Sequence, residues 1–395
     1  MKKKIIILWM LIVFYPVFLH SQAKEIIGYY FCRKWKERNG LVVPRTIPYD
    51  KLTIINYAFF KPLPTGEITG IDTVADSFLL KGEIDSLSGK RIPGTSLIDF
   101  AHRNNVQVML SIGGWEDSNN FSQIASDSGK RSTFAKSCVN SIKTYGFDGI
   151  DIDWEFPCYP SHNGKPQDKH NFTLLLQNLR DSLNTLKKKT GKYYLLSAAL
   201  PSAPSHIVNI EIKKVANILD FLNVMTYDYH GAWESISGYN APLYPSSPKD
   251  DPLLTVDGSF KLYHQTYNIP ASKINIGIPF YGRAYRGCEG PGTPHKGPAV
   301  SVFPGEGGGA YYEILNVMKL FKRCWDDKAK VPYLIDKSRK IFISYDDEES
   351  IAYKADYVLK NHIRGVIIWQ ITGDYLKNGK TPLLDVIYKK FNSSK

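Results

Sequence analysis

The chain has 395 residues, of which 43% are hydrophobic and 22% are charged. This length and composition suit one large α/β domain of roughly 250 to 300 residues with a smaller module, and they exclude a disordered or fibrous protein. The formal net charge is +12, but the lysines are dispersed and form no basic stripe, which argues against nucleic-acid binding.

The first residues follow the order of a signal peptide. Three lysines at positions 2 to 4 precede an apolar run at 5–19, and the small residues Ser21 and Ala23 come next. The apolar run is shorter than the ~20 residues that a membrane-spanning helix needs, although a membrane anchor is the alternative. We therefore predict a signal peptide over 1–23, an exported protein that is secreted or periplasmic, and no stable membrane insertion.

Eight short runs rich in β-branched and aromatic residues recur along the mature chain. They span residues 26–31, 53–60, 106–112, 149–154, 194–199, 221–227, 274–280 and 365–369. Helical patterns lie between them, notably at 132–145, 168–189 and 350–361. Strands that alternate with helices form a parallel sheet, and eight such units predict an α/β protein with a closed (β/α)8 TIM barrel.

Two intervals are longer than a strand-to-helix connection needs. Residues 60–94 form one long loop with short helical pieces, and a second interval, rich in glycine and proline, follows the seventh predicted strand. We predict that the barrel comprises 24–282 and 345–395. Residues 283–344 are then a small α+β insertion between strand seven and helix seven.

The five cysteines indicate no metal site, because they show neither CxxC spacing nor grouping with histidine. An exported protein allows a disulfide between Cys288 and Cys324. The odd number and wide spacing of the cysteines leave the pairing open.

The fourth predicted strand carries three carboxylates on one face. Side chains alternate along a strand, so Asp151, Asp153 and Glu155 share a face at intervals of about 7 Å, while Asp148 faces the other way. In a barrel the shared face is the interior, where an unpaired carboxylate is costly or becomes neutral. Neighbouring carboxylates share protons and raise each other's pKa. Glu155, at the carboxyl end where barrel active sites form, is therefore the predicted general acid. A metal site, a salt-bridge ladder or a solvated edge strand is the alternative.

This strand also resembles a known signature, the DxxDxDxE pattern of glycoside hydrolase family 18. Further motifs follow in the family's order, and they span Ser111 to Trp115 (SxGG), Met225 to Asp228 (MxYD), 279–283 for the seventh strand and 368–370 for the eighth. The interval 282–344 resembles the insertion domain of the chitinase branch. The resemblance covers nearly the whole mature chain, and it implies hydrolysis of β-1,4 bonds between N-acetylglucosamine units of chitin.

The resemblance implies a retaining, substrate-assisted mechanism, an exception to the usual pair of catalytic carboxylates. The substrate's acetamide oxygen attacks the anomeric carbon, while Glu155 protonates the leaving oxygen and later activates the water that opens the oxazolinium intermediate. Asp153 orients the acetamide N–H and balances its charge, Asp151 shares a proton with Asp153, and Tyr227 donates a hydrogen bond to the acetamide. No metal or organic cofactor is implied. Chitin or a chito-oligosaccharide is the expected partner, and we expect a monomer.

Five of the six tryptophans of the mature chain follow or close predicted strands. They are Trp35, Trp115, Trp154, Trp233 and Trp369. Flat rings suit the apolar faces of β-linked sugars, but each ring taken alone fits packing as well, Trp154 best of all because its parity is opposite to that of the carboxylates.

By resemblance, Trp369 is the floor under the sugar at the cleavage point, with Trp115 and Trp233 on either side. The other cleft residues that the resemblance implies are Tyr29, Phe59, Met225, Tyr227, Asp228, Tyr281 and Arg283. Asp148, Gly113 and Gly114 are assigned to structural support.

Two other functions fit parts of the sequence. An endo-β-N-acetylglucosaminidase that acts on protein-linked glycans uses the same acetamide chemistry, but the row of tryptophans, the insertion-like interval and the Glu-Phe-Pro end of the signature favour chitin. A catalytically weak, chitin-binding lectin built on an inactive barrel usually lacks the acid, whereas Glu155 is present.

Overall fold

The computed structural model describes residues 24–393, and the predicted signal peptide at 1–23 lies outside them. Within the described part of the chain, no helix combines the length and the apolar composition that crossing a membrane requires.

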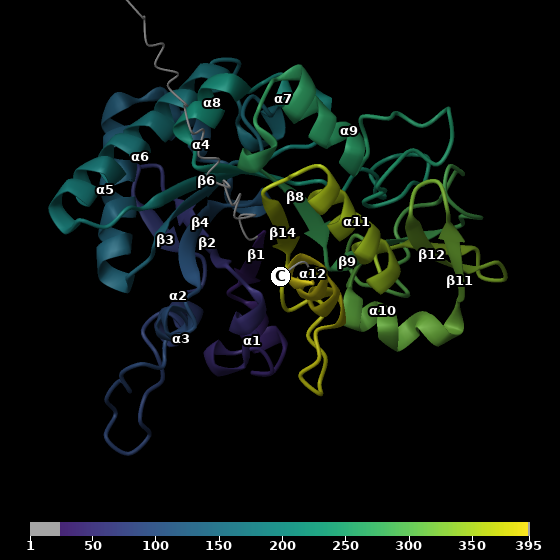
Figure 1. Cartoon of the computed structure of the whole chain (residues 1–395), viewed down its shortest axis with the longest axis horizontal. Helices are drawn as coiled ribbons and strands as arrows, with labels where there is room; N and C mark the ends of the chain where they lie inside the picture. The colour runs from purple at the N-terminus through teal and green to yellow at the C-terminus, as the bar shows by residue number, and fades with distance from the viewer. Residues whose placement is uncertain (1–23, 394–395) are drawn as a thin grey trace, which may run out of the picture.

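Eight parallel strands form a closed barrel (Figure 1), which confirms the predicted TIM barrel. They are β1 (Glu25–Phe31), β2 (Ile54–Pro62), β4 (Gln107–Gly113), β5 (Gly149–Asp153), β6 (Leu195–Leu200), β7 (Phe221–Val224), β8 (Ile274–Pro279) and β14 (Gly365–Trp369). The barrel closes because β1 pairs with β14 on one side and with β2 on the other. The carboxyl ends of all eight strands therefore meet at one rim.

One barrel strand is shorter than predicted. β7 ends at Val224, whereas the apolar pattern continues to residue 227. The hydroxyl of Thr226 donates to the carbonyl of Gly277 and accepts from its N–H, both at 2.8 Å. These side-chain hydrogen bonds replace the main-chain hydrogen bonds between β7 and β8 at this point. The chain therefore leaves the sheet just before Tyr227.

Helices cover the outside of the barrel (Figure 1). They are α1 (Lys34–Glu37), α2 (Thr73–Leu79), α3 (Leu97–Arg103), α4 (Phe121–Ser126), α5 (Ser128–Tyr145), α6 (Asp168–Thr190), α7 (Pro204–Ile207), α8 (Ile212–Ile218), α9 (Val256–Lys261), α11 (Glu348–Lys360) and α12 (Pro382–Asn392). α5 begins four residues before its predicted start because the Asp127 side chain caps it by accepting from the Lys130 N–H.

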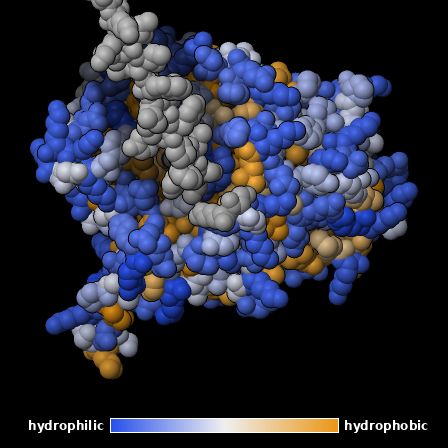
Figure 2. All heavy atoms as spheres, viewed as in Figure 1, coloured by the Kyte–Doolittle hydropathy of each residue, from blue (hydrophilic) through white to orange (hydrophobic). Residues whose placement is uncertain are grey.

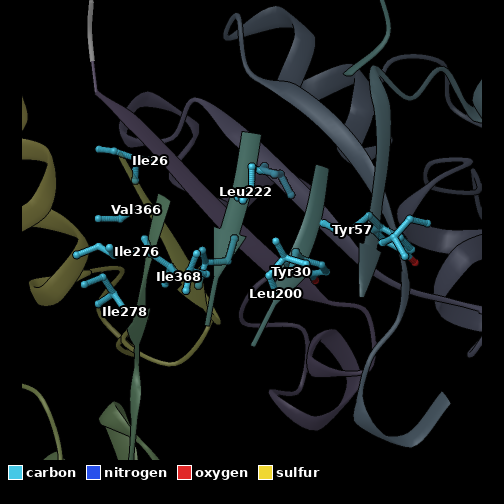
Figure 3. Packing of buried hydrophobic residues seen from close by; sticks show 14 of the residues in the cluster. Ile26, Tyr30, Tyr57, Leu200, Leu222, Ile276, Ile278, Val366 and Ile368 are labelled. Carbon is cyan, nitrogen blue, oxygen red and sulfur yellow. The ribbon is translucent and has the colours of Figure 1, made fainter. Parts of the chain in front are cut away.

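The hydrophobic core lies between the strands and these helices. Figure 3 shows aliphatic side chains from several strands in this layer, among them Ile276, Val366 and Ile368, all of them buried. These residues alternate with the inward-facing ones, so the helices bury one face of each strand and the barrel interior holds the other.

A second sheet follows β8 after a single residue. Its five antiparallel strands have the order β10 (Gly308–Ala310), β9 (Tyr281–Arg286), β13 (Ile341–Ser344), β12 (Val331–Asp336) and β11 (Lys322–Asp326). With helix α10 (Tyr311–Val317) it stands beside the barrel (Figure 1). Because β9 leaves from the carboxyl end of β8, the sheet begins at the active-site rim of the barrel.

The long loop after β2 contains the short strand β3 (Ile68–Gly70) and α2, and then projects as an extended loop. Figure 2 shows a largely hydrophilic face with apolar residues at the tip of this projection, where Ile84 and Leu87 are exposed.

A buried ion pair joins the second sheet to α11. Lys354 is fully buried, and its ammonium lies 2.6 Å from both carboxylate oxygens of Asp346, two residues beyond β13. The hydroxyl of Ser350 donates to the same carboxylate at 2.7 Å. Removal of one partner would leave the other charge buried without compensation.

We therefore expect Lys354→Met to lower the free energy of unfolding by about 3–5 kcal/mol, the cost of an uncompensated buried charge. Lys390→Met is the matched control, because Lys390 forms a partly exposed pair with Asp356. The control should change stability by less than about 1 kcal/mol. Urea denaturation measures both variants, and equal losses would contradict the structural role given to the buried pair.

Candidate active site

The three carboxylates lie where the strand pattern predicted them. Asp151 and Asp153 are on β5 and buried inside the barrel, and Glu155 follows just beyond the end of the strand. Asp148 lies on the outer side, where its carboxylate binds His102 at 2.8 Å, Lys192 at 2.6 Å and the N–H of Val108 at 2.7 Å. Asp148 thus connects the base of β5 to its neighbours and does not face the barrel interior.

Asp151 receives hydrogen bonds from four other strands of the barrel. The donors are Tyr29 and Ser111 to Oδ2, both at 2.8 Å, and Ser197 at 2.6 Å and Asn223 at 3.1 Å to Oδ1. Burial raises the pKa of Asp151, and the hydrogen bonds oppose that shift. Four donors match the acceptor capacity of an ionised carboxylate, so the barrel interior replaces water around this group.

Three of those donors were missed at the sequence level. Ser111, Ser197 and Asn223 are fully buried polar residues on strands β4, β6 and β7. Strict alternation along each strand places them on the interior face, where apolar residues are the rule, so their position was the signal that could have found them.

Tyr29 differs from its expected place in the cleft. Its side chain is only 1% exposed and its hydroxyl donates to Asp151, so it lies beneath the carboxylates and not on the cleft surface. Its hydroxyl reaches Asp151 across the barrel interior, and its ring meets the edge of the Trp369 ring with centroids 5.7 Å apart.

Asp153 and Glu155 lie in a different electrostatic environment. Oδ1 of Asp153 is buried without a hydrogen-bond partner. Burial, together with the charges of Glu155 and Asp151, holds the pKa of Asp153 well above its usual range. Burial and then the charge of Asp228 raise the pKa of Glu155 to about 8. Glu155 is thereby protonated at neutral pH, as a general acid must be.

Gly113 and Gly114 allow the close approach of the β4 end to β5. A Cβ on Gly113 would lie 2.1 Å from the carbonyl oxygen of Asp153, and one on Gly114 would lie 2.8 Å from the Phe59 ring. Both residues also have positive φ, 114° and 86°, which L side chains rarely adopt.

Some of the tryptophans are exposed or half-buried, and others are packed against the core. Trp115 and Trp233 are 50% and 57% exposed, and Trp369 is half-buried, stacked on Phe59 with ring centroids 5.6 Å apart. Trp154 is buried between Phe121 and Phe172, the packing role that its parity favoured. Trp35, grouped with the rim in the sequence, packs on Phe78 against the core.

The second sheet contributes side chains to the same site. Nε of Arg283, on β9, donates to Asp228 at 2.6 Å, and its guanidinium lies over the rings of Trp233 and Tyr281. The Tyr281 hydroxyl is buried without a partner. These contacts connect β9 to the loop after β7 at the edge of the carboxylate site.

Tyr227 connects this group with the carboxylates, because its ring lies edge-on to that of Tyr281, with centroids 6.1 Å apart, and close to Asp153. Burial and the charge of Asp153 hold the pKa of Tyr227 well above its usual range, so its hydroxyl remains a hydrogen-bond donor. A Cβ on Gly277 would come within 2.7 Å of the Tyr227 ring, which shows how closely β8 supports this side chain. Met225 is half-buried and packs against the interior cluster that contains Phe59.

The sequence left open whether the cysteines form a disulfide. In the structure all five thiols are free. Among residues 24–393, no group of three or more histidine, cysteine, aspartate or glutamate side chains has the arrangement of a metal site.

Several known proteins are similar to this chain along most of its length. Residues 25–374 match the family described as glycosyl hydrolases family 18. Chitinase A1 of Niallia circulans is 38% identical over 90% of this chain, which spans 57% of that relative's length. Chitinase B of Serratia marcescens is 28% identical over 95% of this chain and 85% of its own length. The solved structure of chitinase ChiA74 from Bacillus thuringiensis superposes with a TM-score of 0.82 at 30% identity, and covers 94% of this chain and 70% of that one.

The raised pKa of Glu155 predicts a pH-dependent effect on stability. Its native pKa of about 8 exceeds its ordinary value of 4.5, so between these values the native state keeps a proton that the unfolded state has released. The stability that neutral Glu155 contributes is complete below the lower pKa and is lost as the pH rises through the higher one. Glutamine cannot ionise, so we expect Glu155→Gln to raise the thermal midpoint relative to wild type by a margin that grows with pH across this window.

Thermal melts at several pH values measure that margin. Glu289→Gln is the control, because Glu289 forms an exposed pair with Lys340. A margin for Glu155→Gln that stays constant from acid to alkaline pH would mean that Glu155 ionises normally in the folded protein.

Proposed function

The chain belongs to family 18 of the glycosyl hydrolases, and we propose that it is a chitinase that hydrolyses β-1,4 bonds between N-acetylglucosamine units of chitin or chito-oligosaccharides. The observation that carries this proposal is the placement of Glu155, whose pKa is raised to about 8, beside Asp153 at the carboxyl end of β5. Relatives named as chitinases, aligned along most of the chain, support the choice of substrate.

The proposed reaction proceeds with retention and uses the substrate as its own nucleophile. Glu155 donates its proton to the glycosidic oxygen while the acetamide oxygen attacks the anomeric carbon. The bond to the leaving sugar breaks and an oxazolinium ion forms. The Glu155 carboxylate then takes a proton from water, whose oxygen attacks the anomeric carbon and opens the ring. The acid is restored and the product is the β-anomer.

Asp153 would stabilise the intermediate. Its Oδ1 lacks a partner, so it is free to accept the acetamide N–H and to orient the acetamide oxygen towards the anomeric carbon. Asp153 would also balance the positive charge of the oxazolinium ring, and Asp151, which accepts four hydrogen bonds, would share a proton with Asp153. Tyr227 would donate a hydrogen bond to the same acetamide.

Aromatic surfaces would bind the polymer. We assign Trp369 to the floor under the sugar at the cleavage point and the exposed Trp115 and Trp233 to the sugars on either side. Phe59 and Met225 support this floor, while Asp228, Tyr281 and Arg283 form the edge nearest the second sheet. On this proposal residues 283–344 are a module that forms one wall of the cleft.

Two further parts of the proposal concern the protein as a whole. Residues 1–23 would direct export, which brings the enzyme to a polymer too large to enter a cell. We expect no metal or organic cofactor, because the substrate itself supplies the nucleophile. We also expect the enzyme to act as a monomer.

Replacement of the acid tests the proposal. We expect Glu155→Gln to lose at least ~10²-fold in turnover of chitin hexamer, the usual size of a general-acid contribution, and to keep its affinity for the hexamer. Product analysis over time and calorimetry measure the two quantities. Glu289→Gln serves again as the control and should match wild type.

Near-normal turnover in Glu155→Gln would remove this residue from the acid role. A glycoprotein substrate digested side by side tests the substrate class. Release of its glycans without action on chitin hexamer would replace chitin by protein-linked glycans, and binding of the hexamer without turnover would indicate a lectin.

A further inference from the structure

The two loops that follow β4 and β5 hold the main chain of Glu155 from both sides. The Glu155 N–H donates to the hydroxyl of Ser118, in the first loop, at 2.9 Å. The Glu155 carbonyl accepts from Nδ1 of His162, in the second loop, at 2.5 Å. Side chains therefore satisfy both main-chain polar groups of the proposed acid, just beyond the end of the strand.

A tight turn puts His162 in this position. The N–H groups of His162 and Gly164 both donate to the carbonyl of Tyr159, at 3.1 and 2.9 Å. A Cβ on Gly164 would lie 2.3 Å from the Tyr159 nitrogen, so the turn requires glycine there. Asp168, buried at the start of α6, accepts from the N–H groups of residues 158 and 165 on the two sides of the turn. The loop is thus fixed to the barrel independently of any ligand.

The same imidazole also contacts the first loop. The rings of His162 and Trp115 meet edge to face, with centroids 4.5 Å apart and planes at 62°. The amide of Asn163 donates to the carbonyl of Asn119, which adds a second connection between the loops. Trp115 nonetheless remains 50% exposed, so much of the indole is available to another molecule.

The hydrogen bond fixes the tautomer of His162. A carbonyl oxygen only accepts hydrogen bonds, so Nδ1 must carry a proton. One histidine therefore connects two groups by different forces, an N–H to the main chain of Glu155 and a ring edge to the indole of Trp115.

We propose that His162 is a positioning residue that couples Trp115 to the orientation of Glu155. This proposal rests on the function proposed above. A sugar stacked on Trp115 restrains the indole, the indole restrains the imidazole, and the imidazole N–H holds the main chain from which the acid extends. The N–H of His162 therefore affects the rate of the chemical step. The ring of His162 affects the binding of sugar chains that are long enough to reach Trp115.

Two substitutions separate these contributions. His162→Asn places an amide nitrogen at the same number of bonds from Cα as Nδ1, so it keeps the donor and loses the ring. His162→Leu keeps apolar bulk beside Trp115 and loses the donor. Steady-state kinetics on chitin hexamer and on a short chromogenic chitobioside give kcat and KM for each variant.

We expect His162→Leu to lower kcat by roughly 10- to 100-fold on both substrates, as misplacement of a catalytic group does. His162→Asn should keep kcat within about 3-fold of wild type and raise KM for the hexamer several-fold, with little change for the chitobioside. His170→Leu is the control, because His170 is an exposed histidine paired with Glu211 on the outer surface. It should behave as wild type.

Several results would overturn the proposal. Wild-type kinetics in both variants would do so, as would equal losses of kcat in both that follow their thermal midpoints, since that pattern indicates packing alone. Nitrogen-15 NMR of wild type gives a test that needs no substitution, and a His162 ring protonated only at Nε2 contradicts the hydrogen bond. A wild-type protein without hydrolytic activity would instead refute the proposed function, so the two failures are distinguishable.

Discussion

The burial of two carboxylates on the inner face of β5, with a third just beyond the end of the strand, is the constraint on which this site depends. Charged groups inside a barrel are stable only where donors replace water. For Asp151 those donors come from β1, β4, β6 and β7. Because the barrel is closed, strands on both sides of β5 and across the interior reach Asp151, so the closure that builds the core also supplies the hydrogen bonds to this carboxyl group.

The three carboxyl groups differ in their hydrogen-bond donors and in the charges around them. Asp151 has four donors, Oδ1 of Asp153 has none, and Glu155 is partly buried near the charge of Asp228. On the proposed function, a proton shared between Asp151 and Asp153 would lie closer to Asp153, because the pKa of Asp153 is raised further above its usual range. On the proposed function, these differences would leave Asp153 free to accept a hydrogen bond from the substrate and would let Glu155 act as the acid.

Most of the correct predictions from the sequence rested on two regular patterns, the alternation of side chains along strands and the recurrence of apolar runs. Alternation along β5 placed Asp148 outside and the other carboxylates inside, and the eight apolar runs correspond to the eight barrel strands. The same rule, applied to Ser111 and Ser197, would have found the donors to Asp151.

Contacts between loops leave no such regular pattern in the sequence. Ser118 and His162 lie in irregular segments, and their bonds to Glu155 depend on turns that neither spacing nor composition reveals. Trp35 was misplaced for a different reason. Its position after a strand suggested that it lies at the rim of the barrel, but it packs on Phe78 against the core.

The stereochemistry of the first product tests the central claim most directly, because the claim is that the substrate's acetamide is the nucleophile. Proton NMR during the first minutes of chitin hexamer hydrolysis distinguishes the anomers before they interconvert. The account predicts the β-anomer. Initial release of the α-anomer would mean that water attacks directly, and the roles given to Asp153 and Tyr227 would be refuted with it.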